Sequence, residues 1–345
     1  MIFVNGVRFL SDSSSVEGHD MVMALLEHPD LVSASHSFRG IPERKFSVSE
    51  ESGSQNSLQA KFVYVFQREY ATADPTLVEI VGTDEATTCV GIVIRNCKSG
   101  MTSIGHLDSP EVVDIGLSQM LSLVADTDDD AILDVHLVGA FEDSAPQGND
   151  DDDDDTQLEG YSFPLCMKIV KKLVESNVKF QIRNFQVLKH NTRWDSQGNA
   201  YPIFHGLLVE TSSGSVVPAS FDTTTRCPDE IIRRIRLGAS FDDPTWTARL
   251  LETYETQTDR FVIAPFSWSM RRVRIALVMR HWSDLEILVA TSTSPSAEGP
   301  DFVDTQKRVW EYLIQHPDWK QTFPSKLPRV FQRTASGNWS MSLER

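Results

Sequence analysis

A cysteine and a histidine stand near the outer ends of two neighbouring apolar runs. Cys89 lies in the run 87–94, and His106 lies near the end of the run 101–107. The first run is rich in β-branched residues, and the sequence NCKSG between the two is typical of a turn. We therefore predict a β-hairpin whose open ends bring the thiol and the imidazole together. Such a pair is the minimum that nucleophilic catalysis by a thiolate requires.

Position favours Cys89 over the other three cysteines as the nucleophile. Cys166 lies on the apolar stripe of a predicted helix and is expected in the core, and Cys227 precedes a helix and is expected to be structural. Cys97 lies in the turn beside basic residues, but no histidine is near it in sequence. Cys89 begins a strand, where its own N–H is free to donate to an oxyanion.

Two of the nine histidines are candidates for the site. The hairpin directs His106 toward Cys89, which makes it the preferred partner. His136 shares a strand face with Asp134 by two-residue alternation, so an ordinary Asp–His hydrogen bond explains it, and it stays a second candidate. No two histidines have the i, i+4 spacing of a zinc hydrolase. We therefore expect no metal.

Composition restricts the classes of partner. The chain has 345 residues, a hydrophobic content of 40% and a formal net charge of −17, which argues against a nucleic-acid partner and favours a cationic or neutral one. Four cysteines are too few for a disulfide framework, so we expect a reducing compartment. The first residues do not form a secretory signal, and no apolar run reaches the roughly 18 residues of a membrane helix. The expected location is the cytoplasm or the nucleus.

The order of the predicted elements indicates an α+β fold of layered antiparallel β-sheets, sandwich-like, with packed helices. We expect one domain over residues 1–345. Its β-rich catalytic part covers about 61–143, and a second β-rich part covers about 161–345. Six consecutive aspartates, residues 150–155, lie in an acidic insertion of about 144–160 that we expect to be disordered and solvated.

Individual elements are predicted from periodicity and turn residues. A helix is expected within 16–32, followed by a loop over 33–60, and other helices are expected near 112–124, 161–176 and 229–238. Strands are expected at most apolar runs in between, and residues 271–282 are taken as part of the second β-rich half. A closing helix is expected over 303–317.

Six segments in this order give the chain a family resemblance: TDEATTCVGIVIRN, TSIGHLD, LDVHLVGAF, PASFD, IAPFSW and STSPSAEGPDFV. From about residue 61 to the closing helix, the chain resembles the protein N-terminal asparagine amidohydrolase family. The resemblance implies deamidation of an N-terminal asparagine to aspartate with release of ammonia. This reaction is the first step of an N-degron pathway that continues through arginylation to ubiquitin-dependent degradation. The implied partners are proteins or peptides with N-terminal Asn and the enzymes of that pathway.

The resemblance also implies roles for three residues. In that family the nucleophile is the cysteine of the ATTC motif, here Cys89. The chain is further similar to bacterial chemoreceptor glutamine deamidases and related toxin deamidases, in which a histidine follows the cysteine and a threonine precedes it. By this analogy His106 is the base, Thr83 orients it, and the core is that of a Cys–His deamidase.

The chemistry of the residues agrees with this implication. A thiolate paired with an imidazolium can attack a carboxamide while backbone donors hold the oxyanion, so no metal or organic cofactor is needed. Asp84 and Glu85 are expected to meet the α-ammonium group of the substrate, and Glu298, in the loop 292–299, is a further candidate contact. Thr88 and His136 complete the predicted substrate-binding residues.

Two other functions stay open. One is a Cys–His enzyme that acts on internal glutamine or as a thiol hydrolase. The other is a catalytically silent adaptor whose acidic loop binds a basic partner. The intact ATTC and GH sequences count against the adaptor.

Overall fold

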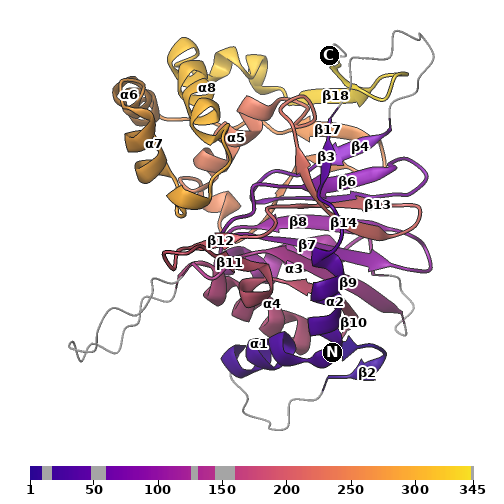
Figure 1. The fold of residues 1–345 in the computed structure, drawn as a ribbon. Helices are drawn as coiled ribbons and strands as arrows, with labels where there is room; N and C mark the ends of the chain where they lie inside the picture. The colour runs from indigo at the N-terminus through magenta and orange to yellow at the C-terminus, as the bar shows by residue number, and fades with distance from the viewer. Residues whose placement is uncertain (10–17, 48–59, 126–130, 144–159, 343–345) are drawn as a thin grey trace.

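The computed structural model describes residues 1–9, 18–47, 60–125, 131–143 and 160–342 (Figure 1). Two large β-sheets lie against each other, and helices gather on one side of them. The predicted disorder of the acidic insertion concerns residues 144–159, which lie outside the described residues. None of the described helices is long and apolar enough to cross a membrane.

The larger sheet in the described residues has eight strands in the order β15-β5-β8-β7-β9-β10-β1-β2. Its centre is the predicted hairpin of β7 and β8, with β9 on the other side of β7. These strands span Leu251–Glu252 (β15), Glu69–Ala73 (β5), Thr102–Leu107 (β8), Val90–Asn96 (β7), Ile132–Gly139 (β9), Lys179–Gln186 (β10), Ile2–Val4 (β1) and Val7–Arg8 (β2).

Helices cover one face of this sheet. Because side chains alternate along a strand, Val90, Ile92 and Ile94 point to the same face, where they join an apolar cluster with residues of α1, α3 and α4. The most amphipathic of these helices, α4, buries residues at helical spacing, including Leu165 and Ile169. These helices span Gly18–Glu27 (α1), Val113–Leu121 (α3) and Ser162–Glu175 (α4).

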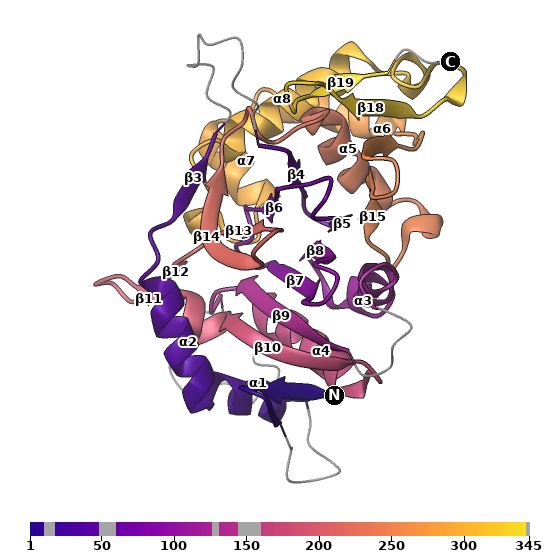
Figure 2. The same cartoon turned by 90° about the vertical axis from the view of Figure 1, so that its right-hand side faces the viewer.

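A second sheet covers the other face, with five strands among the described residues in the order β3-β14-β13-β6-β4 (Figure 2). Val93 and Ile104 of the first sheet pack there with Val81 and Leu207 of the second. The strands are Arg44–Phe46 (β3), Ser215–Phe221 (β14), Leu207–Glu210 (β13), Ile80–Thr83 (β6) and Phe62–Tyr64 (β4), and the helix α2, Pro29–Arg39, packs beside β10.

The C-terminal part adds four helices, α5 to α8, which lie together at the upper left of Figure 1, and a small sheet. They span Glu230–Ser240 (α5), Met270–Met279 (α6), Asp284–Thr291 (α7) and Phe302–Gln315 (α8). The small strands are Thr192–Trp194 (β11), Ala200–Pro202 (β12), Tyr254–Glu255 (β16), Arg260–Ile263 (β17), Arg329–Arg333 (β18) and Trp339–Met341 (β19), of which β16 to β19 form one sheet and β11 and β12 a hairpin.

The α+β class is confirmed, but three details of the prediction were wrong. The sheets are mixed, because β9 pairs in parallel with β10 across the connecting helix α4, and β4 pairs in parallel with β6. Residues 271–282 are mostly helical, since α6 occupies them, and α7 follows directly. Residues 33–39 belong to α2 and not to a loop. Pro29 lies in the first turn of this helix, where a proline is tolerated because its missing N–H would have no partner.

Candidate active site

The hairpin places the predicted nucleophile and base on one face of the larger sheet. In the register of β7 and β8, Val90 pairs with Leu107 and Gly91 pairs with His106. Cys89 directly precedes β7, so alternation puts its side chain on the face of Gly91 and His106. Diagonal neighbours across an antiparallel pair are about 7–8 Å apart, within reach of two facing side chains. This face is the one that the second sheet covers.

Thr83 joins His106 from the second sheet. Its Oγ1 lies 2.8 Å from Nδ1 of His106, and both side chains are buried. The other ring nitrogen, Nε2, is buried and has no hydrogen-bond partner among the described residues. When Nδ1–H donates to Thr83, the lone pair of Nε2 is free to accept a proton. The contact is the one that the predicted orienting role requires.

Backbone hydrogen bonds fix the segment that carries the nucleophile. The N–H of Ala140 donates to the carbonyl of Cys89 at 2.7 Å, and the N–H of Phe141 donates to that of Thr87 at 3.2 Å. Gly139 has a φ of +124°, and a Cβ there would lie 2.5 Å from the Cys89 carbonyl oxygen. The close approach therefore requires glycine. The structure gives the N–H of Cys89 no acceptor among the described residues, so it is free to donate to an oxyanion.

Burial keeps the thiol and the imidazole neutral in the substrate-free protein. Cys89 is 8% exposed, and burial, followed by the charges of Asp108 and Glu298, raises the pKa of its thiol well above the ordinary value. Burial also lowers the pKa of His106 to about 4. Both shifts disfavour the charged forms. In the substrate-free protein these shifts therefore favour a neutral thiol beside a neutral imidazole.

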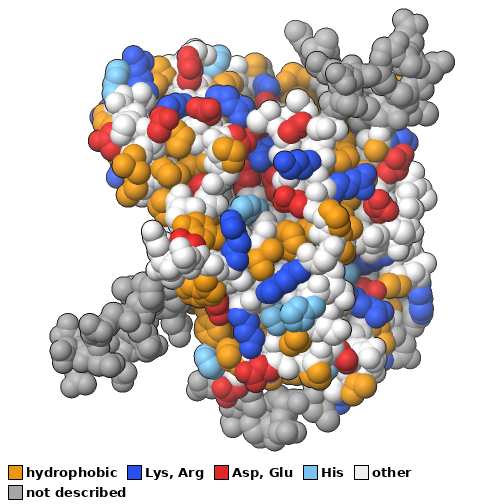
Figure 3. All heavy atoms as spheres, viewed as in Figure 1, with side chains coloured by type: hydrophobic (Ala, Val, Ile, Leu, Met, Phe, Trp, Pro, Cys, Tyr) orange, Lys and Arg blue, Asp and Glu red, His pale blue; other side chains and the backbone are white. Residues whose placement is uncertain are grey.

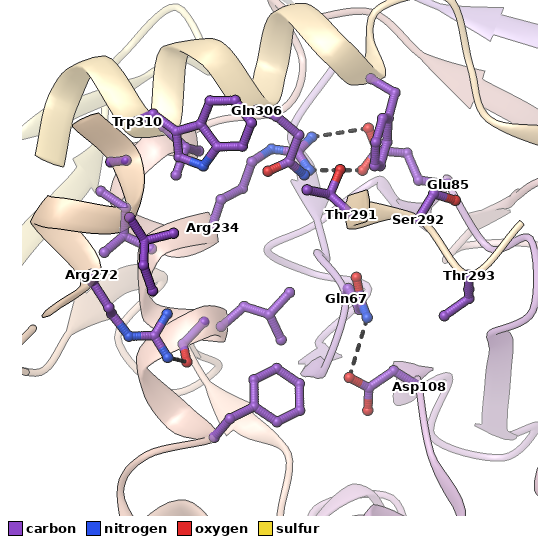
Figure 4. A pocket seen from close by; sticks show the side chains of 18 of the residues that line it. Gln67, Glu85, Asp108, Arg234, Arg272, Thr291, Ser292, Thr293, Gln306 and Trp310 are labelled. Carbon is purple, nitrogen blue, oxygen red and sulfur yellow. Dashed lines mark hydrogen bonds and ion pairs between the residues drawn. The ribbon is translucent and has the colours of Figure 1, made fainter. Parts of the chain in front are cut away.

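A cavity of about 630 Å³ opens beside Cys89. We call its β side the sheet wall: Gln67, Glu85, Thr87, Thr88, Cys89 and Asp108. We call the opposite side the helical wall: the lining residues of α5, α6 and α8 together with Thr291, Ser292, Thr293 and Glu298. Figure 4 shows residues of both walls facing the same space, with Asp108 and Gln67 hydrogen-bonded to each other on the sheet wall.

Asp84 lies behind the sheet wall and does not line the cavity. Its carboxylate accepts hydrogen bonds from the Tyr64 hydroxyl at 2.5 Å, from the Phe221 N–H at 2.7 Å and from Arg226 at 3.2 Å. Burial and the neighbouring Glu85 raise its pKa to about 6. The described partners fill its oxygens, so its position is that of an internal anchor of the loop.

Glu85 lines the cavity but is already paired. Arg234 donates two hydrogen bonds to its carboxylate, at 2.9 and 3.0 Å (Figure 4). Arg226 lies 2.9 Å from it. Burial opposes the ionised form, but the two guanidinium groups outweigh it and lower the pKa of Glu85 to about 2. The side chain is a permanent anion that its arginines neutralise.

Glu298 lines the cavity without an arginine bonded to it. The Ser292 hydroxyl donates to its carboxylate, and no cation pairs with it among the described residues. Burial raises the pKa of Glu298 to about 7. Thr88 also lines the cavity, and its hydroxyl lies 3.1 Å from that of Thr293. The structure therefore places two of the predicted substrate contacts, Thr88 and Glu298, beside Cys89.

His136 lies apart from the cavity. It sits within β9 opposite Val93, and its Nδ1 is buried without a hydrogen-bond partner among the described residues. Asp134 accepts hydrogen bonds from Arg183 at 2.9 Å and from the Cys97 thiol at 3.0 Å. The predicted Asp134–His136 hydrogen bond is therefore absent, because other donors occupy the carboxylate.

Sequence reasoning missed Asp108 and its partner. Asp108 continues β8 and stands opposite Cys89 in the extended register. Nε of Arg68 donates to both of its oxygens, at 3.0 and 3.1 Å. Burial raises the pKa of Asp108, although Arg68 opposes the shift. Its position two residues after His106, on the same strand face, is the signal that could have found it.

Comparisons with known proteins show the family of the chain. The sequence profile of the protein N-terminal asparagine amidohydrolase family matches residues 52–341. The protein N-terminal asparagine amidohydrolase of Arabidopsis thaliana is 52% identical over 345 residues, which cover 98% of this chain and 99% of that protein. The protein of the same name from Homo sapiens is 28% identical over 284 residues, 80% of this chain and 83% of that protein. The chain therefore belongs to the protein N-terminal asparagine amidohydrolase family.

Proposed function

We propose that this chain hydrolyses the side-chain carboxamide of an N-terminal asparagine to aspartate, with release of ammonia, through a covalent intermediate on Cys89. The observation that supports this most is a single cavity that holds a buried thiol and a carboxylate without a cationic partner, Glu298. The family membership supplies the substrate class, since its members are named for N-terminal asparagine.

Recognition of the substrate begins at its α-ammonium group. Among the described residues no guanidinium pairs with Glu298, so it is the natural partner of a cation that enters the cavity. A charge-assisted hydrogen bond contributes about 1.5–3 kcal/mol. Asp84 and Glu85, which the sequence suggested as contacts of the ammonium group, do not bind the substrate directly. They pair with Arg226 and Arg234 and so hold the loop before Cys89.

Binding of the ammonium also prepares the nucleophile. The charge of Glu298 is one of the causes that raise the pKa of Cys89. The positive charge of an ammonium paired with Glu298 offsets this contribution, and the change favours the thiolate. The substrate itself therefore activates the thiol that the free protein keeps protonated.

Catalysis then proceeds in two halves. In the first, Nε2 of His106 takes the proton of the Cys89 thiol, Sγ attacks the carboxamide carbon, and the N–H of Cys89 donates to the oxyanion. His106 gives the proton to the leaving nitrogen, ammonia departs, and a thioester remains. In the second half, His106 takes a proton from water, the resulting hydroxide attacks the thioester, and the product carboxylate leaves with restoration of the thiol. Thr83 holds Nδ1 throughout.

The product, an N-terminal aspartate, indicates which pathway the reaction feeds. An N-terminal aspartate is the substrate class for arginylation, so we propose that this deamidation feeds an N-degron pathway that ends in ubiquitin-dependent degradation. The expected site of action is the cytoplasm or the nucleus, and the expected reaction needs no metal or organic cofactor.

The decisive experiment compares peptides that begin with Asn, acetyl-Asn or Gln with peptides that carry Asn or Gln internally. Deamidation is scored by the mass gain of the peptide and by ammonia release. We expect turnover with free N-terminal Asn, and at least about tenfold lower kcat/KM when acetylation removes the charge. Similar rates on acetyl-Asn or internal Gln would favour the alternative Cys–His deamidase.

A further inference from the structure

The helical wall of the cavity carries a cation that has no hydrogen bond or ion pair within the part of the chain that the structure describes. Three arginines line the cavity: Arg234, Arg271 and Arg272. Arg234 pairs with Glu85, and Arg272 pairs with Asp242 at 2.8 Å. Arg271 has no hydrogen bond and no ion pair among the described residues, and it is exposed at the start of α6.

The chain as a whole is rich in acidic residues. The formal net charge is −17, with 49 acidic and 32 basic residues, so acidic side chains outnumber potential partners. Figure 3 shows acidic, basic and hydrophobic side chains mixed over the upper left of the molecule, where α6 to α8 lie. A cation that stays unpaired in such a chain, on the cavity that holds the nucleophile, is available to a carboxylate of the substrate.

Resting on the proposed function, we propose that Arg271 is a specificity-determining residue that binds a substrate carboxylate downstream of the N-terminal asparagine. When Glu298 holds the ammonium and Cys89 meets the carboxamide, the remainder of the substrate continues from its first carbonyl toward the mouth of the cavity. Arg271 lies on that cavity. An extended chain advances at most about 3.3–3.6 Å per residue, so positions 2 to 4 cover roughly 10 Å beyond the asparagine.

The carboxylate can have two sources, an acidic side chain or the C-terminus of a short peptide. Both present the same charge and the same two acceptor oxygens to a guanidinium. Substrates of five residues with an amidated C-terminus isolate the side chain, and the same peptides as free acids add the terminus. Peptides Asn-Ala-Ala-Ala-Ala with one Asp or one Lys at position 2, 3 or 4 locate the contact.

The control is a second arginine on the same helix. Arg274 is exposed, carries no hydrogen bond or ion pair among the described residues, and does not line the cavity. Arg271→Glu and Arg274→Glu change the net charge equally. A difference between the two variants therefore reports position and not the overall field of the protein.

The expected result is a higher kcat/KM for the Asp peptide than for the Lys peptide by about two- to fivefold at one or more positions, as for an exposed ion pair. Arg271→Glu reverses this order, Arg274→Glu preserves it, and raised salt weakens it. The dipeptide amide Asn-Ala-amide, which lacks a carboxylate, gives each variant its own reference rate, to which the rates on the longer peptides are normalised. If the free acid alone gives the preference, the C-terminal carboxylate is the ligand.

An Asp-to-Lys ratio that is the same in the unaltered protein and in Arg271→Glu, at every position and in both peptide forms, overturns the proposal. Absence of turnover with every Asn peptide, including Asn-Ala-amide, instead overturns the proposed function. Dissociation constants of the same peptides for the Cys89→Ala protein, measured by calorimetry, test the contact of Arg271 independently of catalysis.

Discussion

On the sheet wall of the cavity, Glu85 and Asp108 each face an arginine, whereas Glu298 on the helical wall has a serine hydroxyl as its hydrogen-bond partner. The same chemical group therefore has two electrostatic states in one cavity. The arginines lower the pKa of Glu85 to about 2, whereas Arg68 only partly opposes the rise that burial causes in the pKa of Asp108. The carboxylate without an arginine has a pKa raised to about 7 by burial, and it gains most from a cation brought by the substrate. In the function that we propose, the sheet wall carries the reaction and the helical wall recognises the substrate.

The largest effect is expected from the nucleophile of the sheet wall. Cys89→Ala should lower the rate of deamidation by at least about 10⁴-fold, because no other group can form the thioester. The melting temperature should change little. Cys97→Ala, which alters the exposed thiol of the β7–β8 turn, is the matched control and should keep its activity. Turnover by a folded Cys89→Ala protein would place the nucleophile elsewhere.

Removal of the base should have the next largest effect. His106→Gln keeps a polar side chain in the sheet interior but has no proton acceptor of suitable pKa, so kcat should fall by about 10²–10⁴-fold. Thr83→Val, which removes the hydrogen bond to Nδ1 and preserves the shape, should cost about tenfold in kcat with KM nearly unchanged. Equal kcat in Thr83→Val and the unaltered protein would show that the contact is not needed to orient His106.

The state of the free thiol gives a third test. Since the pKa of Cys89 is raised, its thiolate fraction at pH 7 is below that of an ordinary thiol. Alkylation of Cys89 by iodoacetamide, followed by peptide mass spectrometry, should therefore be at least about tenfold slower than for a small thiol of pKa about 8.5, and should accelerate as the pH rises. Rapid alkylation that persists below pH 6 would instead show that the free protein already holds a thiolate–imidazolium pair.

The helical wall is tested by Glu298→Gln. We expect kcat/KM for free N-terminal Asn to fall about tenfold, mainly through KM, and the rate on acetyl-Asn to stay unchanged. Protonation neutralises Glu298 as the pH falls through about 7, so kcat/KM of the unaltered protein should decrease on that side. Glu298→Gln should lose this decrease. A pH profile that keeps the same acidic limb in the variant would assign the limb to another group.

The smallest effect concerns the link between the walls. One terminal nitrogen of Arg226, Nη1, lies 2.9 Å from Glu85 and 2.5 Å from Asp301 at the start of α8. Asp301→Asn weakens only the second contact. Because this carboxylate is partly exposed, we expect KM to rise about two- to threefold with little change in kcat. A change in kcat as large as that in KM would mean that the link also positions Cys89.

Local patterns in the sequence were sufficient to predict the hairpin of β7 and β8 that carries Cys89 and His106. The β-branched residues after Cys89 and the NCKSG turn are neighbours along the chain, and the alternation of side chains fixed the shared face of Cys89 and His106. They were not sufficient for residues 271–282. Short apolar runs fit strand and helix alike, and only packing against α8 selected the helices α6 and α7.

The sequence by itself therefore determined the residue types of the reaction and the strand that presents them, because these depend on contacts between near neighbours. The tertiary structure decided what each carboxylate does. Asp84 and Glu85 lie next to each other in the chain, yet one is enclosed behind the sheet wall and the other is paired in the cavity, while Glu298 arrives unpaired from a distant loop. The three carboxylates differ in their burial and in their distance from Arg226 and Arg234. Burial and these distances are properties of the folded chain.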